Sequence, residues 1–271
     1  MPETSHGIAF DVAGPETATT PLTLVHAGIA DRRMWDDVWA AVTAERRCLR
    51  LDLRGFGEST SRPHGPLDHA ADVIEALVEA GIGRTHLVGS SLGSGVVVDV
   101  ALRQPDLAAS LALVAPGGPL IAAPTDELRA FWRAEGEALD GGDLDAAVEA
   151  NLRTWVDGRG RSPRDVDPDV RRRVGEMQGR AFEVTADWDD IEEAEPDPPI
   201  LDRLDEIQVP VLVLVGDRDV DAVGIAAHTV VDGVAGSRLI QWPGVAHVPS
   251  LERPAEFIAL LREWLRDVEG S

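Results

Sequence analysis

Residues 85–93 read THLVGSSLG, a Gly-x-Ser-x-Gly motif with Ser91 at its centre. An apolar segment leads into the motif and the apolar stretch Val96–Leu102 follows it, which is the order expected for a strand, a sharp turn and a helix. Glycines flank the serine because larger side chains would not fit beside so tight a turn. The turn holds the hydroxyl out at the carboxyl edge of a sheet, where the free N–H groups of the new helix also point. The stretch therefore predicts an α/β fold with a nucleophilic serine.

Strands and helices alternate along most of the chain. Short apolar runs predict strands at residues 22–25, 48–53, 86–88, 111–114, 211–215 and 237–240. The near-continuous run at 211–215 is typical of a strand that is buried on both faces. Residues 72–80 and 254–268 carry apolar side chains at helical spacing. The alternation predicts a doubly wound, mostly parallel sheet, with a binding site beyond the carboxyl ends of its strands.

One segment breaks the alternation. Residues 119–204 contain no convincing strand, but they hold helical runs at 126–139 and 144–155 and polar, proline-rich punctuation. We expect this segment to form a helical cap over the sheet edge. The core is then formed by residues 1–118 and 205–271.

The expected cap carries three tryptophans, Trp132, Trp155 and Trp188. Two interpretations stay open: they pack inside the cap, or they line a pocket for an apolar or ring-containing group. Phe131 and Met177 belong to the same set under either interpretation.

The composition argues against some kinds of binding partner and excludes some catalytic mechanisms. The net charge is -23, and so acidic a surface repels phosphate backbones, which argues against nucleic acid as a partner. The charge favours solubility or salt tolerance over an acidic interaction surface. All 25 basic residues are arginines, and the chain has neither lysine nor tyrosine. A Schiff-base lysine, a lysine base and a tyrosine acid are therefore excluded.

Cys48 is the only cysteine, so it forms no internal disulfide and has no cysteine companion for a metal. We expect a packed core thiol. Residues 1–10 are polar and lack the basic and apolar regions of a signal peptide, and no apolar run approaches the length of a membrane span. The sequence predicts a cytoplasmic protein without a membrane partner, and it leaves the oligomeric state open.

A serine hydroxyl is a poor nucleophile, and it needs a base that a carboxylate orients. The strand expected at 211–215 runs into the acidic turn Gly-Asp-Arg-Asp, and His247 follows the last strand. The order serine, aspartate, histidine is the one expected beside this serine motif. Asp219 is the expected partner of His247. Asp221 and Asp217 are alternatives, and Asp217 comes early at the strand end.

Several short motifs occur in order over most of the chain. They are VHAG at 25–28 with MW at 34–35, DLRGFGES at 52–59, the serine motif, GDRD at 216–219, and AHVP at 246–249 followed by ERP at 252–254. With them the chain resembles an α/β-hydrolase fold protein, near the cofactor-free esterase, enol-lactonase and perhydrolase branch. The resemblance implies Ser91 as nucleophile, His247 as base and Asp219 as the residue that orients it.

The resemblance also implies an oxyanion hole made of two backbone N–H groups. One belongs to Leu92, directly after the nucleophile, and the other to Gly28 in the loop after the first core strand. Each such donor is typically worth a few kcal/mol. Many relatives have His-Gly where this chain has His26, Ala27 and Gly28, so Ala27 stays an alternative donor.

Structural roles compete with functional ones at several positions. Ser91 is also a residue type that caps helices. His26 resembles the histidine that supports the first loop in the family, and His86 is expected to be a strand residue near the surface. Asp52 and Arg54 are expected to brace the following glycine turn.

The combined features predict hydrolysis of a small carboxylic ester or lactone, with no metal and no organic cofactor. Haloalkane dehalogenases and epoxide hydrolases of this fold use an aspartate at the position of Ser91, and hydroxynitrile lyases that depend on lysine are excluded by composition. Two alternatives remain open. The first is a carbon–carbon bond hydrolase or a cofactor-free perhydrolase with the same triad, and the second is a ligand-binding protein with a slow triad. Stable ligand retention without turnover would indicate the second.

Overall fold

The computed structural model of the protein describes residues 2–16 and 19–270. Within these residues the strands form one sheet of seven, in the order β1-β3-β2-β4-β5-β6-β7. Strands β2 to β7 are paired in parallel, and β1 is added antiparallel to β3 at one edge. The predicted doubly wound, mostly parallel sheet is confirmed.

The strands are β1 (Phe10–Ala13), β2 (Leu22–Val25), β3 (Cys48–Leu51), β4 (Thr85–Ser90), β5 (Ala108–Val114), β6 (Val211–Gly216) and β7 (Arg238–Trp242). The α-helices are α1 (Asp36–Thr43), α2 (His69–Glu79), α3 (Leu92–Arg103), α4 (Asp126–Asp140), α5 (Leu144–Asn151), α6 (Pro168–Thr185), α7 (Asp221–Gly233), α8 (Pro249–Glu252) and α9 (Pro254–Glu269). Short 3-10 helices are η1 (Arg32–Trp35), η2 (Pro105–Leu107), η3 (Gly118–Leu120) and η5 (Ile200–Glu206), and η4 (Leu152–Asp157) is a π-helix.

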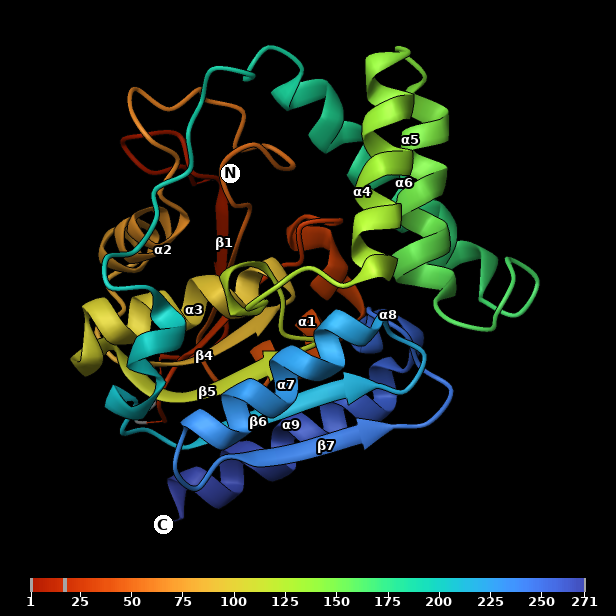
Figure 1. Cartoon of the computed structure of the whole chain (residues 1–271). Helices are drawn as coiled ribbons and strands as arrows, with labels where there is room; N and C mark the ends of the chain where they lie inside the picture. The colour runs from red at the N-terminus through yellow and green to blue at the C-terminus, as the bar shows by residue number, and fades with distance from the viewer. Residues whose placement is uncertain (1, 17–18, 271) are drawn as a thin grey trace.

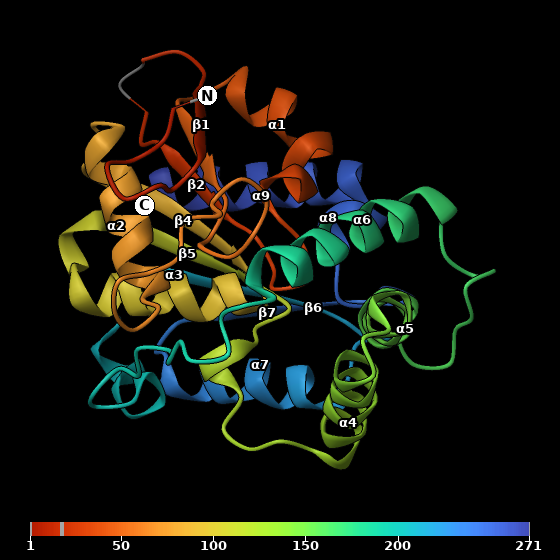
Figure 2. The same cartoon turned by 90° about the horizontal axis from the view of Figure 1, so that it is seen from above.

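Helices cover both faces of the sheet. Figure 2 shows α1 and α9 on one face, and α3 and α7 on the other. Every residue of β4 and of β6 is buried, as expected for central parallel strands between two helical layers. α9 turns its buried side chains, Phe257, Leu261, Trp264 and Leu265, to the sheet side of the molecule. The core therefore lies on both faces of the central strands.

The segment expected to form a cap is helical. Helices α4, α5 and α6 lie side by side beyond the carboxyl ends of the strands (Figure 1). In the described structure, strand pairing within residues 119–204 is limited to an isolated bridge between Glu193 and Leu67. The helix expected at 144–155 is divided, because α5 ends at Asn151 and the chain continues as η4.

Two expectations about single residues have different outcomes. Cys48 is fully buried in β3, which confirms the packed core thiol, and burial raises the pKa of this thiol to about 12. His86 was expected near the surface, and this is wrong. It is 3% exposed, because β4 is a central strand, and it bonds to the Ser110 hydroxyl at 2.8 Å. Burial lowers the pKa of His86, which favours its neutral form.

Among the described residues, no helix has the length and apolar character that crossing a membrane requires.

Candidate active site

The chain turns sharply between β4 and α3, and Ser91 is the residue at the turn. Its backbone φ is 51°, in the left-handed region that side chains other than glycine rarely adopt. Close packing enforces the turn, since a Cβ on Gly89 would overlap the carbonyl of Gly93, and a Cβ on Gly93 would lie 2.5 Å from the carbonyl oxygen of His26. The Ser91 side chain makes no capping hydrogen bond to α3. Its hydroxyl is thus held at the sheet edge without a capping role.

The loop after β5 packs directly on this serine. The backbone N–H of Gly117 donates to the Ser91 carbonyl at 3.2 Å, and a Cβ on Gly117 would lie 2.9 Å from the Ser91 Oγ. A side chain larger than hydrogen at this position would therefore crowd the hydroxyl. Our sequence analysis missed Gly117, although the Pro-Gly-Gly-Pro run at 116–119 was a usable signal.

His247 and Asp219 are brought together on neighbouring loops. The His247 Nδ1 lies 2.8 Å and 3.0 Å from the two carboxylate oxygens of Asp219, and the side chains are 1% and 2% exposed. A carboxylate only accepts hydrogen bonds, so Nδ1 carries the proton. The two alternatives point elsewhere: Asp217 accepts from the Gly244 N–H at 2.6 Å, and Asp221 accepts from the Thr125 hydroxyl at 2.6 Å.

The loop after β2 contains both candidates for the second oxyanion donor, Ala27 and Gly28, and their contacts differ. The N–H of Ala27 donates to the Met34 Sδ at 3.3 Å, so this amide is already engaged. Gly28 lies beside Leu92, since a Cβ on Gly28 would be 3.6 Å from the Leu92 Cβ. This arrangement favours Gly28 over Ala27 as the partner of the Leu92 N–H.

His26 has a structural place in the same loop. Its Nε2 accepts from the Leu53 N–H at 2.8 Å, and its Nδ1 donates to the Ala27 carbonyl at 2.9 Å. Burial lowers the pKa of His26, so the ring stays neutral and keeps one donor and one acceptor. The ring thereby ties the end of β3 to the loop that carries Gly28.

The three cap tryptophans have separate environments. The Trp155 ring centroid is 4.5 Å from that of His247, and Phe131 packs edge-on against Trp155 at 5.2 Å. Trp188 is buried instead against the turn at Gly55. Trp132 is 48% exposed on α4. The structure thus brings Trp155 to the histidine and does not bring Trp132 or Trp188 there, because they belong to other surfaces of the cap.

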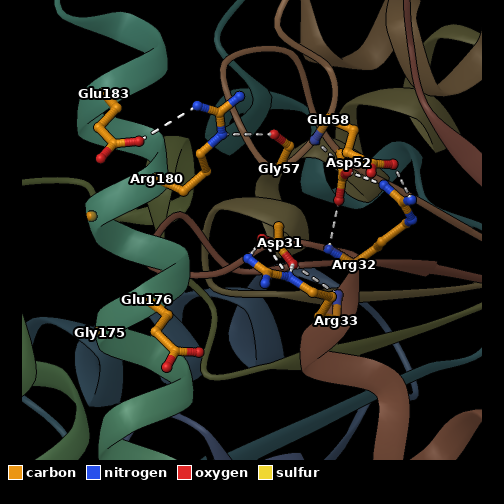
Figure 3. Close-up of a pocket in the computed structure, with 11 residues that line it drawn as sticks. Asp31, Arg32, Arg33, Asp52, Gly57, Glu58, Gly175, Glu176, Arg180 and Glu183 are labelled. Atoms are coloured by element: carbon orange, nitrogen blue, oxygen red, sulfur yellow. Dashed lines mark hydrogen bonds and ion pairs between the residues drawn. The ribbon is translucent and has the colours of Figure 1, made fainter.

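A polar cavity of about 550 Å³ lies between α6 and the core (Figure 3). Its core side consists of the loops at residues 31–33 and 52–58. Several of the charged side chains that line it are paired with one another: Arg32 with Asp52 and Glu58, Arg33 with Asp31, and Arg180 with Glu183. Arg180 also donates to the Gly57 carbonyl at 3.4 Å. Each arginine that lines this contact between cap and core is thus already paired with a carboxylate.

Asp52 and Arg54 hold the glycine turn in different ways. The carboxylate of Asp52 accepts from the Glu58 N–H at 2.9 Å and closes the turn as expected, and burial raises its pKa. Arg54 reaches outward to Asp72 on α2, with Nη2 at 2.6 Å from the carboxylate, and to the Ser61 carbonyl. The turn is therefore fixed both to itself and to α2.

Comparisons with known proteins identify the family of this chain. A pimeloyl-[acyl-carrier protein] methyl ester esterase of Neisseria meningitidis (serogroup C) is 27% identical over 93% of this chain and 95% of its own length. The dihydrolipoyllysine-residue acetyltransferase component of the acetoin cleaving system of Pseudomonas putida is 41% identical over 36% of this chain, and the match spans about a quarter (27%) of that protein. The solved enol-lactonase of Burkholderia xenovorans LB400 superposes with a TM-score of 0.77 at 23% identity, over 95% of this chain and 96% of that one. The model of the family described as "Alpha/beta hydrolase family" matches residues 24–260. The chain therefore belongs to the alpha/beta hydrolase family.

Proposed function

We propose that this protein hydrolyses small carboxylic esters or lactones through an acyl-enzyme, with Ser91, His247 and Asp219 as its triad. The observation that carries the proposal is the contact between the His247 Nδ1 and the Asp219 carboxylate at 2.8 Å. It fixes the tautomer that leaves Nε2 as the base. The left-handed turn at Ser91 supports the role of its hydroxyl as nucleophile.

The proposed reaction has two halves. Ser91 Oγ attacks the carbonyl carbon while the His247 Nε2 takes the hydroxyl proton, and the oxyanion accepts hydrogen bonds from the N–H groups of Leu92 and Gly28. His247 then gives the proton to the leaving alkoxide as the C–O bond breaks. A water molecule, deprotonated by His247, attacks the acyl-enzyme, and the acid leaves as Ser91 recovers its proton. These steps balance without a metal or a redox partner.

The substrate is proposed to be small and apolar or ring-containing. Trp155 and Phe131 are both buried and follow one another from His247 into the cap, which supports an apolar wall beside the base. Aromatic side chains of this kind present large apolar surfaces, and their rings pack well against other flat groups.

The decisive experiment measures turnover of p-nitrophenyl acetate and butyrate by the wild type and by three variants. We expect Ser91→Ala to abolish turnover, Asp219→Asn to lower kcat by about 10⁴-fold through the wrong tautomer, and Asp217→Asn to stay within about threefold of wild type. Asp217→Asn is the matched control, because its carboxylate bonds to the backbone of Gly244.

A fluorophosphonate label, located by mass spectrometry, checks the nucleophile independently of the substrate. Label on Ser91 with no turnover of either ester would redirect the search to lactones and to carbon–carbon bond substrates. If the wild type neither turns over these esters nor takes the label, the proposal is wrong and ligand retention becomes the property to measure.

A further inference from the structure

One residue of the cap makes two different contacts with His247. The backbone N–H of His247 donates to the carbonyl of Trp155 at 3.1 Å, and the two rings lie 4.5 Å apart at an interplanar angle of 44°. Trp155 is 8% exposed and His247 is 1% exposed, so water is excluded from this contact. Asp219 holds one edge of the imidazole, and Trp155 holds its backbone and lies against the ring.

The backbone around Trp155 explains how a cap residue reaches the base. Trp155 lies in the π-helix η4, and π-helical turns occur mostly as single insertions in helices, often at functional sites. The turn ends at Gly158, whose φ is 69°. A Cβ there would lie 2.7 Å from the Cβ of Ala246, next to His247. The N–H of Arg159 donates to the Arg218 carbonyl at 2.7 Å, beside Asp219.

Arg161 completes the attachment on the histidine side. Its guanidinium donates to the Gly244 carbonyl at 3.0 Å and to the Glu252 carboxylate at 2.6 Å. The other oxygen of Glu252 accepts from the Ala246 N–H at 2.7 Å. Residues 155–161 are thus bonded to the loop of the acid and to the loop of the base at once.

We propose that Trp155 is a positioning residue for His247, acting through its carbonyl on the backbone and through its indole on the ring. The inference rests on the proposed function, because it assigns Trp155 a role only if His247 is the base. When His247 takes the serine proton, it becomes a buried cation. Asp219 compensates that charge on one side, and an indole within about 6 Å stabilises it further by a factor of roughly 2 to 30.

The test leaves unchanged the charged groups that contact His247 or its loop. Asp219 is in direct contact from the loop after β6. The pair of Arg161 and Glu252 bonds to the backbone of the His247 loop. Substitution of Trp155 therefore changes the aromatic contact while the formal charges stay the same.

The test compares Trp155→Leu and Trp155→Phe with the control Trp132→Leu, which replaces the half-exposed tryptophan of the same cap. We measure kcat/KM for p-nitrophenyl acetate from pH 5 to pH 9. For Trp155→Leu we expect a loss of roughly 2- to 30-fold at the plateau. We also expect the midpoint of the acidic limb to move to lower pH by about 0.4 unit or more, since the cation loses a stabilising contact. Because Trp155→Phe keeps an aromatic ring, we expect its kcat/KM and its acidic midpoint to change less than half as much as in Trp155→Leu. We expect Trp132→Leu to match the wild type in both.

Three outcomes would overturn the inference. If Trp155→Leu has the kcat/KM of the wild type, Trp155 does not position His247. A loss of activity with an unmoved acidic limb reduces Trp155 to a structural role. If the wild type shows no turnover and no label on Ser91, both the proposed function and the role of Trp155 are wrong. If the wild type is labelled and active and Trp155→Leu is unchanged, only the role of Trp155 is wrong. If Trp155→Leu does not fold by near-ultraviolet circular dichroism, Trp155→Met takes its place with the same expectations.

Discussion

At the scale of single residues, backbone strain gathers around the proposed nucleophile. In the described parts of the chain, the left-handed residues other than glycine are Ser91, with φ 51°, and Ala115, with φ 48°. Ala115 follows β5 and precedes the loop whose Gly117 packs on the Ser91 hydroxyl. Strain of this kind persists where the surrounding structure enforces it, and it is concentrated at functional sites. Both positions shape the same hydroxyl.

His69 gives a prediction about pH at this scale. Its Nδ1 is buried without a hydrogen-bond partner, and burial lowers its pKa from 6.5 to about 4. Between about pH 6.5 and pH 4, His69 binds a proton in the unfolded chain but stays neutral in the folded protein. The free energy of unfolding therefore falls as the pH falls. We expect His69→Leu to weaken this dependence by as much as about 1.4 kcal/mol per pH unit in that window.

Urea unfolding of both proteins at pH 7.5, 6 and 5 checks this prediction. At pH 7.5 the difference in the free energy of unfolding reports packing alone, and it serves as the internal reference. Parallel pH dependences for the two proteins would contradict the assignment.

At the scale of elements, the π-helix η4 and the glycine that ends it couple the cap to the core. Gly158 and Gly160 both have left-handed φ values, 69° and 72°. Gly158 is also packed against the Arg218 carbonyl and Ala246, whereas a Cβ on Gly160 would meet only the end of the Arg218 side chain, at 3.8 Å. Gly158 also has ψ -176°, in a region that is essentially restricted to glycine, so both its conformation and its crowding oppose a side chain there.

Gly158→Ala and Gly160→Ala form a matched pair. We expect Gly160→Ala to lose about 1 kcal/mol of unfolding free energy, which is the cost of a left-handed alanine. Gly158→Ala should lose about 2–6 kcal/mol, because the backbone conformation costs a residue other than glycine about 1–3 kcal/mol and overpacking adds about 1–3 kcal/mol. Urea midpoints measure both values, and turnover of p-nitrophenyl acetate should fall only for Gly158→Ala. Equal losses for the two variants would show that crowding at Gly158 relaxes freely.

The central strands could be predicted from the sequence, because strands that are buried on both faces consist of consecutive apolar residues. The run at 211–215 is β6, and the run before Ser91 is β4. β1 was not predicted, because it is an edge strand of four residues in which only Phe10 is buried. The division of the expected helix at 144–155 was also not predicted, since a π-helical turn has no distinct hydrophobic period.

The candidate site divides in a similar way. Ser91, Asp219 and His247 each follow a strand, so chain order placed them at one sheet edge. The choice between Gly28 and Ala27 depends on the Met34 sulfur, a contact through space that no local pattern contains. The choice among the cap tryptophans depends on helix packing in the same way, and only Trp155 of the three stacks on His247.

At the scale of the whole molecule, the net charge of -23 sets the response to salt. Many arginines are committed to ion pairs, such as Arg46 with Glu269 at 2.6 Å. The excess carboxylates repel one another in the folded state. Raising sodium chloride from 0.01 M to 0.3 M shortens the screening length from about 30 Å to about 6 Å. The repulsion then weakens more than the short ion pairs do, and stability increases.

We expect Tm to rise by several degrees over this range, at about 2–4 °C per kcal/mol for a protein of this size. Thermal melts followed by circular dichroism measure the shift. Potassium chloride at the same concentrations is the control, because screening depends on ionic strength and not on the identity of the cation. A Tm that falls with sodium chloride would mean that attractive pairs dominate the electrostatics of this fold.

The attachment of residues 155–161 also has a consequence for motion. Because this segment is bonded to the loops of Asp219 and His247, this part of the cap is anchored to the loop of the proposed base. Its opposite end, the turn between α4 and α5, exposes Leu139 and Leu144 and is held by no such bonds to these loops. Movement of this outer hairpin would therefore leave the position of the proposed base undisturbed.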